Sequence, residues 1–192
     1  WNCCGATAYM GVDQLQAYAL AARNLALSEV QGKDLVAPCS ACYLVLNKTQ
    51  RRLHEDSTTR KLIGDALQAG GIVLDGEGAR VRHPLDVLVN DVGLEAIRQR
   101  ITHSLSGLKV APYYGCQIVR PYAEFDDQRD PTAMARLISV TGATPIDFSL
   151  KTKCCGGSQT GTLPEIGQRL VFILLQEAQT RGADIIATVC PL

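Results

Sequence analysis

Apolar residues along this chain follow two spacings, and each spacing predicts a different kind of element. In the first part of the chain they recur at steps of three and four, which is the spacing of one face of an α-helix. These residues are Leu15, Ala19, Ala22 and Ala26. We therefore expect a helix from about Val12 to Ser28, followed by a short strand at Leu35–Ala37 that leads into Pro38 and Cys39.

The last part of the chain repeats this order. Pro164 opens a helix at a position where a missing backbone N–H costs little, and Gly182 ends it. The expected buried stripe of this helix is Ile166, Leu170, Ile173, Leu174 and Ala178. The apolar run Ala183–Val189 then predicts a buried strand that ends on Cys190.

The middle of the chain predicts helices and strands in alternation. Helices are expected at Tyr43–Leu53, Thr58–Ala69, Pro84–Val89, Leu94–Ile101 and Met134–Val140. Strands are expected at Leu108–Ala111 and Thr144–Phe148, with a turn at Gly76–Gly78. This alternation indicates an α/β fold with largely parallel strand pairing.

The cysteines form a pattern that occurs twice. The pairs related by a constant offset of 151 residues are Cys3 and Cys154, Cys4 and Cys155, and Cys39 and Cys190. Each adjacent pair is followed by a glycine, so the motif Cys-Cys-Gly is itself duplicated. We therefore predict two pseudo-symmetric repeats, residues 1–90 and 91–192, each with a small, mainly parallel sheet flanked by helices.

The two remaining cysteines have counterparts that fall just outside the chain. The counterpart of Cys42 would be residue 193, and that of Cys116 would precede Trp1. The chain also opens on Trp1 without an initiator methionine. We expect the natural protein to extend at both ends, so that the first repeat lacks its N-terminal part and the second its C-terminal part.

Composition narrows the class of protein. Hydrophobic residues make up 46% of the 192 residues, as in globular proteins. The 19 basic and 19 acidic residues balance without a long basic run, so nothing favours nucleic acid as a partner. No run of about 18 apolar residues predicts a membrane span. A chain of this length does not need disulfide staples, so the thiols favour a reducing compartment. We expect a cytoplasmic protein that meets a membrane only through partners.

The cysteine chemistry favours a metal centre. Thiolates are soft ligands that select zinc, copper(I) or iron–sulfur clusters. The Cys39-x-x-Cys42 step lets two sulfurs reach one centre. Adjacent cysteines are unusual for zinc because neighbouring side chains point apart, and they suit a larger inorganic core. The glycine after each pair allows a tight approach of the backbone. The spacing therefore favours iron–sulfur clusters, and zinc stays an alternative.

Whole segments around the cysteines match one family. They are Trp1–Ala6, Pro38–Cys42, Ala111–Cys116, Lys151–Gly156 and Cys190–Leu192, together with the non-cysteine segments His83–Leu85 and Val89–Gly93. In this order the segments resemble the CCG-domain family typified by the B subunit of heterodisulfide reductase. The resemblance covers essentially the whole chain and is far more specific than a single Cys-x-x-Cys motif.

The resemblance implies two non-cubane [4Fe–4S] clusters that face each other across a pseudo-twofold axis, each bound by five cysteines. The first cluster would take Cys3, Cys4, Cys39 and Cys42, and the second Cys116, Cys154, Cys155 and Cys190. The fifth ligand of each would lie outside this chain. No catalytic residue beyond the cluster ligands is indicated.

The resemblance also implies an activity and partners. The protein would be an oxidoreductase acting on sulfur groups, namely the catalytic iron–sulfur subunit of a heterodisulfide reductase-type complex. A disulfide such as that of coenzyme M and coenzyme B would be reduced to two thiols between the clusters. Electrons would arrive from a C-like subunit with ferredoxin-type iron–sulfur clusters, which an A-like flavoprotein subunit supplies.

Two other functions stay open. One is a CCG iron–sulfur subunit of another redox complex, such as succinate:quinone or thiol:fumarate reductase, lactate or glycolate oxidation, or sulfur oxidation. The other, from a different class, is a zinc-stabilised interaction module with tetrahedral four-cysteine sites.

Several residues near the cysteines allow a functional and a structural interpretation. The basic residues Lys151, Lys153 and Arg120 could offset cluster charge or bind an anionic substrate, or be solvated surface charges. His83 precedes a proline, which favours capping or packing over proton donation. The other candidates are Tyr113 and Tyr114, which line the site or pack in the core; Trp1, which is expected to shield a cluster; and His54 and His103, which are expected at the surface.

Overall fold

The computed structural model describes residues 2–75 and 80–191, and its contacts divide the chain into two units. The first unit is Trp1–His83 and the second is Pro84–Leu192. The repeat boundary expected between residues 90 and 91 stays a prediction. Trp1 and the turn expected at Gly76–Gly78 lie outside the described residues. In the described part of the chain no helix combines the length and the apolar character needed to cross a membrane.

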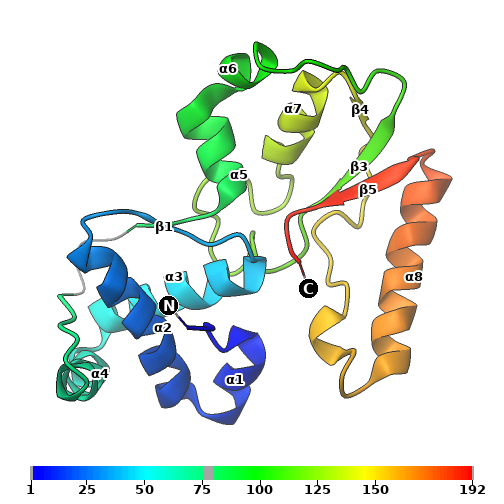
Figure 1. Ribbon diagram of the computed structural model, residues 1–192. Coiled ribbons are helices and arrows are strands. Elements are labelled where there is room, and N and C mark those ends of the chain that lie inside the picture. The colour runs from blue at the N-terminus through cyan, green and yellow to red at the C-terminus, as the bar shows by residue number, and fades with distance from the viewer. Residues whose placement is uncertain (1, 76–79, 192) are drawn as a thin grey trace. The chain divides into compact units, whose positions relative to one another are not determined.

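The first unit is mostly helical and carries one pair of short strands (Figure 1). Its elements are α1 (Ala6–Val12), α2 (Gln14–Val30), β1 (Leu35–Val36), α3 (Ser40–Glu55), α4 (Ser57–Ala69) and β2 (Val81–Arg82). Helix α2 packs against both α3 and α4. Strand β1 pairs in parallel with β2, so that Leu35 lies opposite Val81.

Small residues and caps explain how α2 and α4 fold. Ala17, Ala21 and Ala22 are fully buried on α2, which lets neighbouring helices approach closely. The Asp13 carboxylate accepts a hydrogen bond from the Gln16 N–H and caps α2. Asp56 caps α4 in the same way. Hydrogen bonds to the Asp56 carboxylate from the Thr59 hydroxyl and, to a smaller extent, from the Thr59 N–H lower the pKa of this carboxyl.

The second unit is built around a three-stranded parallel sheet. Its helices are α5 (Pro84–Asp86), the π-helix η1 (Val87–Gly93), α6 (Leu94–Arg98), α7 (Ala133–Val140), the 3₁₀-helix η2 (Gly157–Gln159) and α8 (Pro164–Thr180). Its strands are β3 (Lys109–Tyr113), β4 (Thr144–Pro145) and β5 (Ile185–Thr188), in the order β4-β3-β5. A buried cluster joins the sheet to α8 through Ala111, Tyr113, Phe148, Leu174 and Ala178.

The structure confirms the predicted fold class, including the parallel pairing of the described strands and the repeat of one element order. Helices α2 and α8 are each 17 residues long and hold equivalent places after their Cys-Cys-Gly motifs. Displaced by 151 residues, β1 falls inside β5. Each repeat therefore runs from a Cys-Cys-Gly turn through a long helix to a short parallel strand, and then to a cysteine.

Several predicted boundaries were wrong. Helix α3 begins at Ser40 rather than Tyr43, and α1 was not predicted. The helix expected to end at Val89 continues as a π-helix to Gly93, a distortion that apolar spacing does not reveal. The strand expected at Thr144–Phe148 shrinks to two residues, because only these pair with β3.

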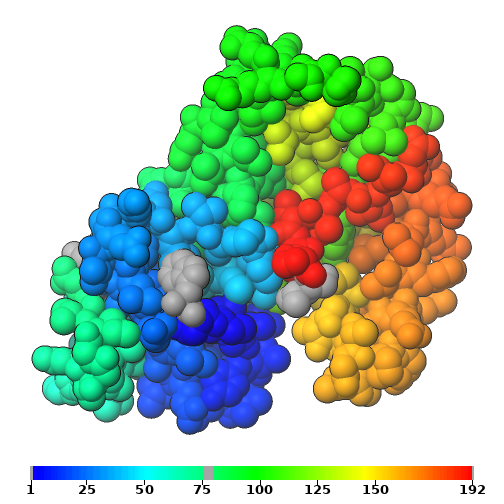
Figure 2. All heavy atoms as spheres, viewed as in Figure 1, coloured from blue at the N-terminus to red at the C-terminus, as the bar shows by residue number. Residues whose placement is uncertain are grey.

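The expected apolar stripes are also only partly buried. On α8, Leu174 and Ala178 are buried, whereas Ile166 is 42% exposed and Ile173 38% exposed. On α2, Ala22 and Ala26 are buried but Leu15 is exposed. Helix α8 meets the sheet along a narrow line, and its outer side forms open surface (Figure 2). Strand β5 is likewise partly exposed instead of buried.

We predict that Phe148→Ala will destabilise the second unit more than Phe172→Ala. Phe148 is 1% exposed in the buried cluster, so Phe148→Ala should lower the free energy of unfolding by about 3–5 kcal/mol, measured by urea denaturation. Phe172 on α8 is 53% exposed, so Phe172→Ala is the matched control and should change it far less. Equal effects of the two substitutions would contradict this packing.

Candidate metal sites

Three cysteines of the first unit gather where β1 meets α3. The Cys4 Sγ lies 2.8 Å from the Cys42 Sγ, well beyond the ~2.05 Å of a disulfide bond. Cys39 also interacts with the Cys42 thiol. All three thiols are free, and Cys4 is buried. Cys3 faces solvent beside them.

The start of α3 explains why Cys39 and Cys42 share one location. Cys39 is the N-cap of α3, and Cys42 is the third helical residue. Residues three apart lie on the same face of a helix, so both thiols stand at its N-terminus. The partial positive charge of this end stabilises thiolates. We expected α3 to begin after Cys42; with the earlier start, Cys42 lies within the first turn.

Burial keeps the Cys42 thiol protonated in the metal-free protein. It raises the pKa of Cys42 far above its ordinary value, and the hydrogen bond and charge of Cys4 raise it further, with a smaller effect from Cys39. Since metals bind the thiolate, loading this site must release protons.

A pocket of about 150 Å³ opens beside these thiols. It is lined by Asn2, Cys3, Cys4, Asn24, Leu35, Val36, Ala37, Pro38, Cys42 and Leu46. Asn24 on α2 ties the motif down, because its side chain accepts from the Asn2 N–H at 3.2 Å and donates to the Asn2 carbonyl at 3.0 Å. Arg23 donates to the Asn2 side chain at 2.8 Å. The role of Asn24 was not predicted, since its only signal in the sequence is a single amide within an Ala/Leu-rich helix.

The two Cys-Cys-Gly turns have the same backbone conformation. Gly5 and Gly156 adopt φ values of 81° and 78°, in the left-handed region that side chains disfavour. The Gly5 N–H donates to the Cys3 Sγ at 3.4 Å, and the Gly156 N–H donates to the Cys154 Sγ at 3.3 Å. The duplicated motif therefore builds a duplicated sulfur-binding turn.

In the second unit, Cys116, Cys154 and Cys155 come together. Burial raises the pKa of Cys116 to about 11, with further contributions from the charge and hydrogen bond of Cys154. The Cys155 Sγ accepts from the Gly157 N–H at 3.3 Å. Cys190 follows β5, which pairs in parallel with β3 so that Tyr113 lies opposite Thr188. Cys116 and Cys190 therefore both follow strands that end at the same edge of the sheet.

Hydrogen bonds fasten the Cys116 segment to the Cys154 loop. The Lys151 carbonyl accepts from the N–H groups of Tyr114 and Gly115, at 2.9 and 3.1 Å. The Tyr113 hydroxyl donates to the Lys153 carbonyl at 2.6 Å. Arg120 donates to the Thr152 carbonyl. These bonds set the spacing between Cys116 and the Cys154–Cys155 pair.

The other candidates have mainly structural partners. The Lys151 ammonium lies 2.5 Å from Asp130 and 2.7 Å from Asp147, and these hydrogen bonds outweigh the opposing effect of burial and raise its pKa. Lys151 is thus paired with carboxylates, whereas Lys153 is exposed. His83 is buried, with its ring edge-on to Tyr43 at 5.8 Å, as expected for packing. His54 and His103 are exposed, as predicted.

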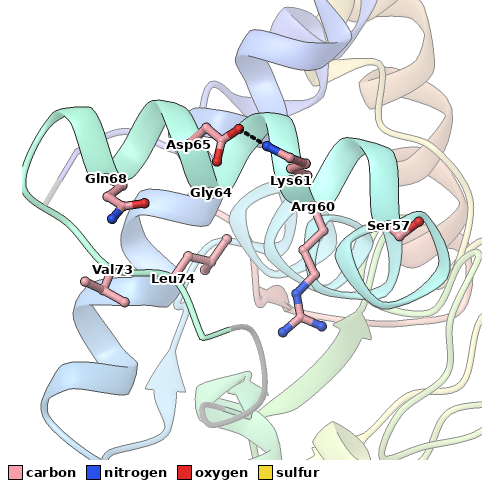
Figure 3. A pocket seen from close by; sticks show the side chains of 8 residues that line it. All are labelled: Ser57, Arg60, Lys61, Gly64, Asp65, Gln68, Val73 and Leu74. Atoms are coloured by element: carbon pink, nitrogen blue, oxygen red, sulfur yellow. Dashed lines mark hydrogen bonds and ion pairs between the residues drawn. The ribbon is translucent and has the colours of Figure 1, made fainter.

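A second pocket lies along α4, and none of its described lining residues is a cysteine (Figure 3). It measures about 380 Å³ and is lined by Ser57, Arg60, Lys61, Gly64, Asp65, Gln68, Val73 and Leu74. Lys61 and Asp65 form an ion pair of 2.6 Å across one turn of α4. This pocket has no thiol ligand and is not part of the candidate metal sites.

The donor set suits a thiolate-bound centre, although it is not preformed around a single ion. Within residues 2–75 and 80–191 no three acidic, histidine or cysteine side chains surround a ready-made ion position. The Cys4 and Cys42 sulfurs are neighbours, so both can reach one centre. Free thiols beside N–H donors fit a group held by thiolates.

Comparison with known proteins places the chain in a family. The family model of the cysteine-rich domain, CCG, matches residues 1–47 and 110–192, more than half of the chain. The chain therefore belongs to the cysteine-rich CCG domain family. This confirms the family resemblance inferred from the sequence motifs.

Proteins similar to this chain are named after redox enzymes. A protein of Archaeoglobus profundus that is named as similar to the B subunit of heterodisulfide reductase is 32% identical over 98% of this chain and 65% of its own length. The B subunit of the ferredoxin/F(420)H(2)-dependent CoB-CoM heterodisulfide reductase of Methanosarcina acetivorans is 32% identical over 99% and 64%. The 8-methylmenaquinol:fumarate reductase membrane anchor subunit of Wolinella succinogenes is 30% identical over 100% and 66%. The chain thus spans about two thirds of the length of these relatives.

We predict that Gly156→Ala will disrupt the second turn. A Cβ at Gly156 would meet the Gly167 Cα and the Leu170 Cδ1 at 2.9 Å, and the left-handed φ would be strained as well. We expect a loss of about 1–3 kcal/mol in the free energy of unfolding, measured by urea denaturation.

The matched control is Gly11→Ala on α1, where a Cβ would meet nothing within 4 Å. Alanine is the better helix former, so this variant should be as stable as the parent or more so. A Gly156→Ala protein of unchanged stability would show that the turn does not require glycine.

Proposed function

We propose that this chain forms the core of an iron–sulfur redox subunit that reduces a disulfide, as in the B subunit of heterodisulfide reductase. The observation that carries the proposal is the duplicated site. Two Cys-Cys-Gly turns of the same conformation each bring thiols together with cysteines at a strand end. One such site would serve a structural metal; two equivalent sites suit a reaction that divides two electrons between two sulfurs.

The proposed ligands are the eight cysteines. Cys3, Cys4, Cys39 and Cys42 would hold the first cluster, and Cys116, Cys154, Cys155 and Cys190 the second, each of the non-cubane [4Fe–4S] type. When bound, such a pair of clusters supplies one electron per site and a Lewis acid for each sulfur of the substrate. Further ligands would come from beyond this chain.

The residues of this chain have separate tasks in that reaction. The cysteine thiolates would bind the clusters. The N–H groups of Gly5, Gly156 and Gly157 stabilise the negative charge on the ligand sulfurs. The apolar lining at Leu35–Pro38 limits water beside the first site. The overall change balances when a disulfide takes up two electrons and two protons, so that its S–S bond breaks and two thiols form.

The proposed electron donors are a C-like subunit with ferredoxin-type iron–sulfur clusters, together with an A-like flavoprotein subunit. Support comes from the relatives, which are named as subunits of reductases that use ferredoxin or F(420)H(2). A second candidate function is a subunit of a fumarate reductase complex. The similarity to the Wolinella succinogenes protein over the whole chain favours that candidate, and the electron acceptor distinguishes the two.

We predict that the natural full-length protein, purified without oxygen, will contain about eight irons and a matching amount of acid-labile sulfide. It should reduce a CoM-CoB-type disulfide with a reduced low-potential dye as the electron source. Zinc without sulfide would contradict the proposal and leave the interaction module. Clusters without disulfide reduction, but with electron exchange between a quinol and fumarate in the complex, would favour the second candidate.

Ligand variants test the two sites separately. Cys42→Ser should lose the cluster of the first site and Cys154→Ser that of the second, so each should contain about half of the iron. Leu62→Ala, a substitution at an exposed residue of α4, is the control and should keep all of it. Full iron content in both cysteine variants would contradict the ligand assignment.

A further inference from the structure

Two adjacent tyrosines at the end of β3 have hydroxyls with different hydrogen-bond partners. The Tyr113 hydroxyl donates to the Lys153 carbonyl, next to the Cys154–Cys155 pair, at 2.6 Å. The Tyr114 hydroxyl accepts from the Met134 N–H at 2.9 Å, at the start of α7. Both side chains are buried, at 8% and 1% exposure. Tyr114 thus supports a helix, whereas Tyr113 reaches the cysteine loop.

Tyr113 is surrounded by the second cysteine site. Its ring belongs to the buried cluster against which Cys155 packs. Gly115 lies so close that a Cβ there would sit 3.6 Å from the Tyr113 hydroxyl oxygen. Among the thiols, the Tyr113 hydroxyl interacts most strongly with Cys155 and more weakly with Cys116 and Cys154. One hydroxyl therefore adjoins both a backbone acceptor and the sulfurs.

Whether Cys155 ligates a metal centre decides which acceptor the hydroxyl favours. As a neutral thiol, Cys155 carries a proton and is a weak acceptor, so the phenol donates to the Lys153 carbonyl. As a metal-bound thiolate, Cys155 has no proton and bears negative charge, which makes it a strong acceptor. The phenol O–H can turn about its C–O bond without moving the packed ring.

We propose that Tyr113 is a positioning residue of the second site, whose hydroxyl donates to the Lys153 carbonyl in the metal-free protein and turns to donate to a thiolate of the Cys154–Cys155 pair when a cluster is bound. The inference rests on the proposed function, because it needs a redox-active centre bound by these cysteines. Hydrogen bonds to ligand sulfurs stabilise the more negative, reduced state of a cluster. Tyr113 therefore raises the reduction potential of the second site.

Substituting the two tyrosines in the full-length, cluster-loaded protein tests this inference. Tyr113→Phe keeps the ring and removes the donor, so the second site should become harder to reduce. We expect a roughly tenfold change in its one-electron reduction equilibrium, which is a fall of ~59 mV, in a redox titration followed by electron paramagnetic resonance. The potential of the first site should not change, and the Cys42→Ser protein assigns the signals.

Tyr114→Phe is the matched control, since it also removes one buried hydroxyl two residues from Cys116. It should lower thermal stability through the lost acceptor for Met134 and leave both potentials unchanged. Equal potentials in Tyr113→Phe and the parent would overturn the inference, as would the same shift in Tyr114→Phe. A parent protein without iron would instead refute the proposed function, so the two failures can be told apart.

A second variant covers the case in which Tyr113→Phe fails to hold a cluster. Incorporating 3-fluorotyrosine at position 113 keeps the packing and makes the phenol a stronger donor. The potential of the second site should then rise, opposite to the effect of phenylalanine. An unchanged potential in that protein would overturn the inference, because a purely structural tyrosine would not respond to donor strength.

Discussion

Both candidate sites depend on the hydrogen bond from the glycine N–H to the first sulfur of each Cys-Cys-Gly turn. The Gly5 and Gly156 N–H groups donate to the cysteine two residues earlier. Both glycines also adopt a left-handed conformation, with φ near 80°. This φ turns the chain into the next helical segment, α1 in the first unit and η2 in the second. Each glycine therefore holds the sulfur through its N–H and sets the direction of the following chain through its φ.

Burial of neighbouring thiols is the second constraint. The Cys4 and Cys42 sulfurs are neighbours, and burial raises the pKa of Cys42 and of Cys116. Buried thiolates would also repel one another, which favours the protonated form of these two thiols. A bound cation or cluster removes that penalty, which couples metal loading to proton release. The N–H donors and the start of α3 are in place to stabilise the charge that results.

Much of this arrangement could be predicted from the sequence, because the cysteines repeat at one offset and the helices between them have clear apolar spacing. The short strands that precede Cys39 and Cys190, and the parallel pairing of strands, followed from that order. Long-range contacts could not be predicted: Asn24 holding Asn2, and Tyr113 reaching Lys153, depend on the tertiary fold. The exposure of Ile166 and Ile173 on α8 was not predicted. Apolar spacing identifies an apolar face of a helix, but it does not show which residues of that face another element covers. The eight ligand assignments remain predictions.

Mössbauer spectroscopy of the ⁵⁷Fe-enriched full-length protein is the decisive measurement for the two proposed clusters, since it reports the type of iron centre as well as its amount. We expect the signals of two sulfur-ligated multinuclear clusters, with about half of the spectral area lost in Cys154→Ser. Mononuclear iron, or a spectrum that Cys154→Ser leaves unchanged, would contradict this expectation.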